Sequence, residues 1–408
     1  MSDTASPTAS HTASHTASHA ALDATGSSLS FASGARSEAK VADKEHVIDA
    51  MRGFAALLVA YFHCRQVEWV GMQSFHHAAG KSLDLNAIVA YLTLPIAWGS
   101  AGVPIFFVIS GYCIHRGAAQ RLAIHSAYRL DAMNFWARRF ARIYPVLFAA
   151  LLLTLALDWT SLHFPPVNHK ILDIGPTAFL VNLFSLQGVA GKTYGSNGAL
   201  WTLSLEVQFY AVYPLLFALR RRLGMMPVLG LVALVNIASV FVFERHDLQF
   251  FTSFWFAWTL GAWIAEAQVK RDAARQRMPW LMYGAAASLT ALGCAAFHFG
   301  QYAAFQLWAL GFACYLNEAL KSRRHNDTPV IRTLSRFGDF SFSLYSIHLP
   351  VFVLLASLLY RSTLQMSILP SFAFMLVAVA VAWVFYRCVE LPAMKWSAGL
   401  KPAGARSR

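Results

Sequence analysis

Long apolar segments alternate with short polar ones along most of this chain, starting near residue 46. Each apolar run has about 18 residues or more, which is enough for a helix to cross a hydrocarbon core of ~30 Å. Two shorter apolar stretches, 86–98 and 176–189, are expected to be interfacial or re-entrant pieces. The pattern predicts ten membrane-spanning helices, at 47–66, 101–118, 143–160, 199–219, 227–243, 250–268, 280–298, 302–320, 341–359 and 368–387.

Composition supports a membrane protein over a soluble one. Of the 408 residues, 57% are hydrophobic and 13% are charged, whereas soluble domains carry about 25% charged residues. Twelve Trp and fourteen Tyr suit helix ends at the membrane interface. The net charge of +13 does not indicate nucleic-acid binding, because the basic residues cluster in short loops between apolar runs. The expected fold class is an all-α bundle of about ten transmembrane helices.

The distribution of Lys and Arg predicts how the helices are oriented. With the N-terminus placed inside, 27 of the 33 basic residues fall on the inner side and six on the outer side. This asymmetry follows the positive-inside rule. We therefore expect an even number of spans with both termini cytoplasmic, in a cell membrane such as a bacterial inner membrane.

Three regions are expected along the chain. Residues 1–45 repeat the tetrad Thr-Ala-Ser-x, lack the apolar core of a signal peptide and are expected to be disordered. Residues 46–396 form the expected membrane domain, followed by a short basic tail at 397–408. The five Cys are scattered and include no CxxC, so neither a disulfide framework nor a Cys metal site is expected.

The N-terminal repeat also carries three histidines, His11, His15 and His19. In a helix they would share one face, where they could bind a metal. A solvated tail is the expected state, because Ser, Thr and Ala cannot bury a core.

Ionisable side chains inside membrane spans are costly and commonly functional. Arg52 and His63 lie in the first predicted span, eleven residues apart. At about 100° per residue they share a helix face, separated by ~16 Å along the axis. Glu206, in the fourth span, is expected near the depth of His63, where it could orient the imidazole as a general base. A structural hydrogen bond to a neighbouring helix is the alternative for both residues.

Three further features have both a functional and a structural interpretation. His348 lies two residues before Pro350, which frees a backbone carbonyl one turn earlier for a polar neighbour. Arg139 and Arg142 share a helix face and could bind phosphate bidentately, although positive-inside anchoring explains them equally. Ser110, beside a glycine in the second span, is expected to allow close helix packing rather than to act as a nucleophile.

Six segments, in order, resemble motifs of the acyltransferase family 3 of membrane-bound O-acyltransferases. The first contains Arg52 and His63, the third Arg139 and Arg142, and the fifth ends at His348. One such motif is weak evidence, but six in order over about 46–396 are specific. The segments are 48–63, 103–111, 139–145, 200–210, 340–348 and 390–392.

This chain departs from the family's motifs at a few positions. Thr202 replaces the usual Ser after Trp201, which keeps a hydroxyl, and Phe342 stands where Tyr is common. No esterase-like domain follows the tenth predicted span, so the stand-alone type is expected.

The resemblance implies an enzyme that uses an acyl-CoA-type donor, such as acetyl-CoA, from the cytoplasm, with no bound cofactor or metal. The implied acceptor is a carbohydrate hydroxyl on a surface or exported glycan, for example an exopolysaccharide, in contact with polysaccharide biosynthesis or export machinery. In the expected mechanism His63 is the general base, and Glu206 orients it or binds acceptor. The expected substrate-binding residues are Arg52, Arg139, Arg142 and His348.

Two other classes of function remain open from the residues alone. In a transporter or flippase for a glycan or lipid-linked sugar, the buried charges would form a proton or substrate path. The two halves of the sequence show no detectable repeat, which disfavours this class. The other is a non-enzymatic assembly factor for polysaccharide export.

Overall fold

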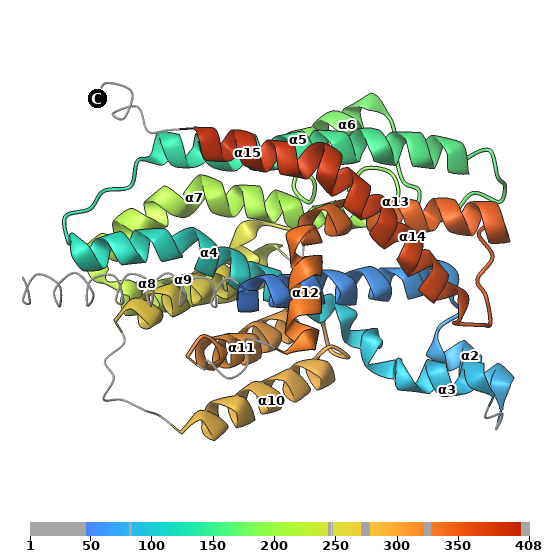
Figure 1. Ribbon diagram of the computed structural model, residues 1–408, viewed down its shortest axis with the longest axis horizontal. Coiled ribbons are helices and arrows are strands. Elements are labelled where there is room, and N and C mark those ends of the chain that lie inside the picture. Colours follow the sequence, from blue (N-terminus) through green and yellow to red (C-terminus); the bar gives the residue numbers. More distant parts are fainter. Residues whose placement is uncertain are drawn as a thin grey trace, which may run out of the picture.

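The computed structural model describes residues 46–80, 84–243, 246, 248–270, 278–321 and 328–400. Its regular elements in this part of the chain are helices, most of which run side by side in a bundle (Figure 1). The predicted tail 1–45 with its three histidines, and positions 401–408 of the predicted basic tail, lie outside the described residues.

The bundle begins with the helix His46–Glu68, called here the first helix. The elements labelled η are short 3-10 helices, except η5, which is one π-helical turn. In chain order the elements that follow are α2 (Met72–Ala79), α3 (Leu85–Leu92), η1 (Leu94–Ala101), α4 (Gly102–Ile124), α5 (Ala132–Ser161), α6 (Pro176–Leu183), η2 (Gly198–Leu200), α7 (Trp201–Leu223), α8 (Met225–Phe243), η4 (Phe251–Ser253), α9 (Trp255–Val269), α10 (Pro279–Ala296), α11 (Gln301–Ala319), α12 (Pro329–Asp339), α13 (Ser341–Tyr360), α14 (Pro370–Phe385), η5 (Tyr386–Glu390) and α15 (Leu391–Gly399).

Seven helical segments of the described chain are long and apolar enough to cross a membrane, by length and composition. They account for the first five predicted spans and the last two. The other three predicted spans are also helical, but α9 has only 15 residues and α10 and α11 fall outside the same limits. The protein is therefore a multi-pass membrane protein. The seven segments are His46–Glu68, Leu85–Ile124, Ala132–Ser161, Gly198–Leu223, Met225–Phe243, Ser341–Tyr360 and Pro370–Gly399.

The two short apolar stretches have different structures. The stretch 86–98 forms α3 and part of η1, which lead directly into α4, so that one helical segment runs from Leu85 to Ile124. The second predicted span, 101–118, coincides with the first part of α4, which begins at Gly102. In the stretch 176–189, only α6 is helical.

Two prolines inside helices leave backbone carbonyls without their usual helical donor, and a side chain donates a hydrogen bond to each of these carbonyls. Pro350 cannot donate to the carbonyl of Ser346, which instead accepts from Asn197 Nδ2 at 2.8 Å. Pro214 similarly leaves the carbonyl of Tyr210, which accepts from the Trp136 indole at 2.9 Å. The predicted satisfaction of the carbonyl before Pro350 is thus confirmed.

Helices α4 and α9 pack backbone against backbone. A Cβ added to Gly111 would overlap the carbonyl oxygen of Trp258, and one added to Gly261 would overlap that of Val108. Glycine at both positions therefore permits the approach, in agreement with the packing interpretation of the second span.

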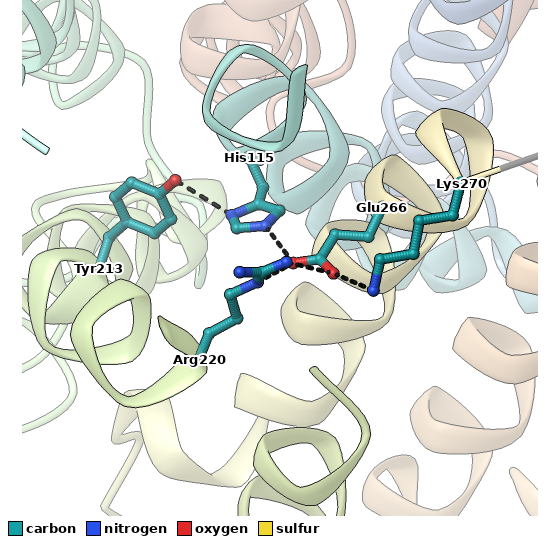
Figure 2. A network of polar contacts seen from close by, with 5 residues as sticks. All are labelled: His115, Tyr213, Arg220, Glu266 and Lys270. Atoms are coloured by element: carbon teal, nitrogen blue, oxygen red, sulfur yellow. Dashed lines mark hydrogen bonds and ion pairs between the residues drawn. The ribbon is translucent and has the colours of Figure 1, made fainter. Parts of the chain in front are cut away.

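A buried polar network joins α4, α7 and α9, as Figure 2 shows. The Glu266 carboxylate accepts from both Arg220 Nε and Nη2, from His115 Nε2 at 3.1 Å, and pairs with Lys270 at 3.3 Å. On the other side of its ring, His115 Nδ1 contacts the Tyr213 hydroxyl at 3.1 Å. Because these partners come from three helices, the network fixes how those helices sit against one another.

Candidate active site

A cavity of about 170 Å³ opens between the first helix, α4, α5, α7 and α13. Its charged lining consists of Arg52 from the first helix, Arg139 and Arg142 from α5, and Glu206 from α7. The structure therefore brings together the three arginines that the sequence places far apart. We call this space the arginine cavity.

Three guanidinium groups and one carboxylate give the arginine cavity a net positive charge, which favours an anionic ligand. The guanidinium carbon of Arg139 lies 5.9 Å from the ring centre of Tyr210, which also lines the cavity. Arg52 also pairs with Asp49 at 3.5 Å, one turn earlier in the first helix. Apolar and hydroxyl side chains of α4 and α13, such as Phe106 and Ser341, complete the lining.

Two hydroxyl groups hold the carboxylate of Glu206. Ser110 Oγ donates to Oε1 at 3.0 Å, and the hydroxyl of Tyr210, one turn along α7, donates to the same oxygen. The indole of Trp258, fully buried on α9, donates to Ser110 Oγ at 3.2 Å. Ser110 thus relays a hydrogen bond from α9 to Glu206, a role beyond the packing expected from the sequence.

The imidazole of His63 pairs with that of His348. The ring planes are 9° from parallel, the ring centroids are 5.1 Å apart and His63 Nδ1 lies 2.8 Å from His348 Nε2, so the rings meet edge to edge. His348 is fully buried, and its Nδ1 lies 2.9 Å from the carbonyl oxygen of Leu344.

These contacts determine where the protons of the pair lie. The carbonyl oxygen of Leu344 can only accept, so His348 carries its proton on Nδ1. A neutral His348 therefore accepts at Nε2, and His63 donates its Nδ1 proton to that nitrogen. The remaining nitrogen of His63, Nε2, is left without a proton. It has the lone pair that a general base requires.

Tyr345 connects the histidine pair with the arginine cavity. It lines the cavity, and its ring centre lies 5.8 Å from that of His348. Its hydroxyl is held by Thr202 Oγ1 at 2.7 Å, so the departure from Ser at position 202 keeps a hydroxyl in contact with the site. Neither His63 nor His348 belongs to the cavity lining.

The contacts do not support the expected pairing of His63 with Glu206. Glu206 bonds to Ser110 and Tyr210, whereas His63 bonds to His348. Equal depth does not by itself bring two side chains together: Glu206 faces the arginine cavity from α7, while α13 presents His348 to the first helix.

Comparison with known proteins identifies the family of the chain. A family profile described as "Acyltransferase domain" matches residues 45–387, which is most of the chain. The chain belongs to the acyltransferase 3 family. This membership favours the enzyme interpretation of the sequence over the transporter and assembly-factor interpretations.

Several curated proteins are similar to parts of the chain. The acyltransferase MdmB of Streptomyces mycarofaciens is 27% identical over 43% of this chain and 40% of its own length. Nodulation protein 10 of Rhizobium leguminosarum bv. viciae is 28% identical over 43% of this chain and 44% of its own. The peptidoglycan O-acetyltransferase OatA of Listeria monocytogenes is 31% identical over 33% of this chain and 22% of its own length. The chain thus spans less than half the length of each of these relatives. No solved structure matches it significantly.

Some residues of this acyltransferase site were missed from the sequence. Tyr210 and Tyr345 lie within the family-like segments and one turn from Glu206 and His348, and this spacing could have identified them. Trp258 had no comparable signal, because only the packing of α9 on α4 brings it to Ser110.

Glu390, in the last family-like segment, is fully buried and accepts from the backbone N–H of Ser343 at 3.0 Å and from its hydroxyl at 2.5 Å. It therefore caps the first turn of α13, the helix that carries Tyr345 and His348.

Proposed function

We propose that this protein transfers an acyl group, such as acetyl, from an acyl-CoA-type donor to a hydroxyl of a surface or exported carbohydrate. The observation that carries the proposal is a pair of consecutive hydrogen bonds, one between the Leu344 carbonyl and His348 and one between His348 and His63. It leaves a basic nitrogen on a membrane-spanning helix, close to a cavity lined by arginines. The name of the Listeria relative, a peptidoglycan O-acetyltransferase, supports O-acyl transfer to a glycan.

The arginine cavity is the proposed donor site. Arg52, Arg139 and Arg142 would bind the phosphates of the donor, because guanidinium groups match phosphate oxygens in charge and geometry. The apolar lining from α4 and α13 would accommodate the thin arm that ends in the thioester. Glu206, held by Ser110 and Tyr210, would orient the donor in this cavity rather than orient His63.

In the proposed reaction, Nε2 of His63 removes the proton from the acceptor hydroxyl while its oxygen attacks the thioester carbon. The carbon–sulfur bond breaks, and the thiolate takes the proton from the His63 imidazolium. The products are the carbohydrate ester and the free thiol, with no net change in protons. His348 stays neutral and holds His63 through the Nδ1 hydrogen bond in both states.

Replacing His63 tests this function. His63→Gln keeps a polar side chain but cannot accept and return a proton, so acyl transfer should fall by ~10²–10⁴-fold. His298→Gln, which changes an exposed histidine between α10 and α11, is the matched control and should transfer normally. Acyl esters on host glycans are measured by mass spectrometry, together with the amount of protein in the membrane. Normal transfer by the His63→Gln variant would remove His63 from the mechanism.

A further inference from the structure

A second cavity, of about 420 Å³, lies beside the start of α7. The loop 184–197, η2, the first residue of α7 and the segment before η4 form much of its wall. We call it the loop cavity.

Adjacent residues at the start of α7 face different cavities. Leu200 and Thr202 line the arginine cavity, whereas Gly198 and Trp201 line the loop cavity. This short segment therefore separates the two spaces. Helix α13, which carries His348, touches the partition, because a Cβ on Gly198 would lie 3.7 Å from Cδ1 of Leu349.

We infer that the loop cavity binds the carbohydrate acceptor, an inference that rests on the proposed function. Trp201, half-buried and packed against Phe254 and Phe305, offers an aromatic ring on which the C–H face of a sugar can stack. Thr193 and Gln249 supply neutral hydrogen-bonding groups.

The charge of the loop cavity also suits a sugar better than a nucleotide. Among the described residues of its lining, Lys192 is the one that carries a charge, so this part of the wall fits a neutral or weakly acidic sugar. The arginine cavity, with its three guanidinium groups, carries more positive charge than the described lining of the loop cavity. The two cavities are thus chemically matched to different substrates.

Buried polar side chains hold the wall of the loop cavity in place. Asn182 donates to the carbonyl of Lys192 at 3.0 Å, and Asp158 accepts from Ser196 through both its N–H and its hydroxyl. Gly188, at φ 87°, passes so close to Gln249 that a Cβ would lie 2.8 Å from the Gln249 Cβ. A wall fixed in this way forms a binding site before the ligand arrives.

Thiol labelling tests the acceptor site without knowing the sugar in advance. Lys192→Cys places a thiol on an exposed residue of the loop cavity, and Thr363→Cys places one on the exposed α13–α14 connection as control. Spheroplasts carrying each variant, or the unchanged protein, are treated with a bulky, membrane-impermeant thiosulfonate. Labelling is quantified by mass spectrometry, acyl esters on host glycans are measured, and acetyl-CoA binding is measured on the purified labelled proteins.

We expect labelled Lys192→Cys to lose transfer relative to its unlabelled form while still binding acetyl-CoA, and labelled Thr363→Cys to keep both. Retained transfer in labelled Lys192→Cys, loss of its acetyl-CoA binding, or an equal loss in labelled Thr363→Cys would each overturn the acceptor site. Absence of acyl esters with the unchanged protein, compared with cells lacking it, would instead refute the proposed function.

Discussion

At the scale of single residues, the site depends on hydrogen bonds that fix side-chain orientation and protonation. His63 is held by His348, which is held by a backbone carbonyl one turn back on α13. Glu206 is held by Ser110, which is held by Trp258. Neither His348 nor Trp258 lines the arginine cavity or the loop cavity, so replacing each of them separates positioning from direct participation.

The hydrogen bonds between the Leu344 carbonyl and His348 and between His348 and His63 predict the effect of changing His348. His348→Leu removes the acceptor for the His63 Nδ1 proton, so His63 can place its proton on Nε2 and lose the base. We expect kcat to fall towards the ~10²–10⁴-fold limit for losing a general base, with little change in the KM for acyl-CoA. His348→Gln retains an acceptor oxygen and should recover part of the rate. Equal rates in the Leu variant and the unchanged protein would exclude the positioning role.

The hydrogen bonds from Trp258 to Ser110 and from Ser110 to Glu206 predict the effect of removing the Trp258 indole N–H. Trp258→Phe keeps the ring but loses the hydrogen bond to Ser110, worth about 1 kcal/mol net, so kcat/KM for the donor should fall roughly fivefold. Trp308→Phe is the control, since the Trp308 indole N–H is equally buried and has no hydrogen-bond partner in the described structure. Steady-state kinetics of the two variants compares them directly. Similar losses in both would mean that Trp258 contributes only packing.

At the scale of helices, glycines and proline-freed carbonyls set how the elements meet. Gly111 and Gly261 allow α4 and α9 to touch through their backbones, which brings Trp258 to Ser110. Asn197, from the loop before α7, bonds to the carbonyl that Pro350 frees, next to His348. The packing of α9 on α4 and of this loop on α13 therefore helps to position side chains of the site.

Two glycines of α4 predict opposite effects on stability. Gly111→Ala places a methyl group against the Trp258 carbonyl, so overpacking should lower stability by ~1–3 kcal/mol. Gly117→Ala meets open space and should be neutral or gain up to about 1 kcal/mol from helix propensity. Thermal unfolding of the purified proteins in one detergent measures both. If Gly111→Ala were as stable as Gly117→Ala, the close α4–α9 contact would be disproved.

At the scale of the whole molecule, the number of membrane crossings determines whether the two termini lie in the same compartment. Seven crossings would put the two termini in opposite compartments, whereas ten would put them in the same one. The difference lies in α9, α10 and α11, which are helices but are shorter or less apolar than the seven candidates. Figure 1 shows α9, α10 and α11 beside the other helices of the bundle.

Reporter fusions distinguish these two topologies. The 27-to-6 distribution of basic residues predicts a cytoplasmic reporter after Arg222 and after residue 408, and an external one after Arg361. A reporter after His298, between α10 and α11, should be external if both helices cross. Paired cytoplasmic and periplasmic reporters at each position provide the measurement. Identical signals after Arg361 and residue 408 would refute the orientation.

The sequence by itself determined the helical membrane class, the positions of most helices and the family. Hydrophobic length and ordered motifs are local properties, so they can be read without knowing which helices touch. It also identified Arg139 and Arg142 as one helix face, because i, i+3 spacing is set within one helix.

Only the tertiary structure decided which polar groups meet. His63 and His348 are 285 residues apart, and Ser110 and Glu206 are 96 apart, so helix packing and rotation determine their pairing. His63 and Glu206 bond to other partners for this reason: depth along two helices can be estimated from sequence, but the direction in which each helix faces cannot. The loop cavity likewise exists only because Asp158, Asn182 and Gly188 hold distant segments against one another.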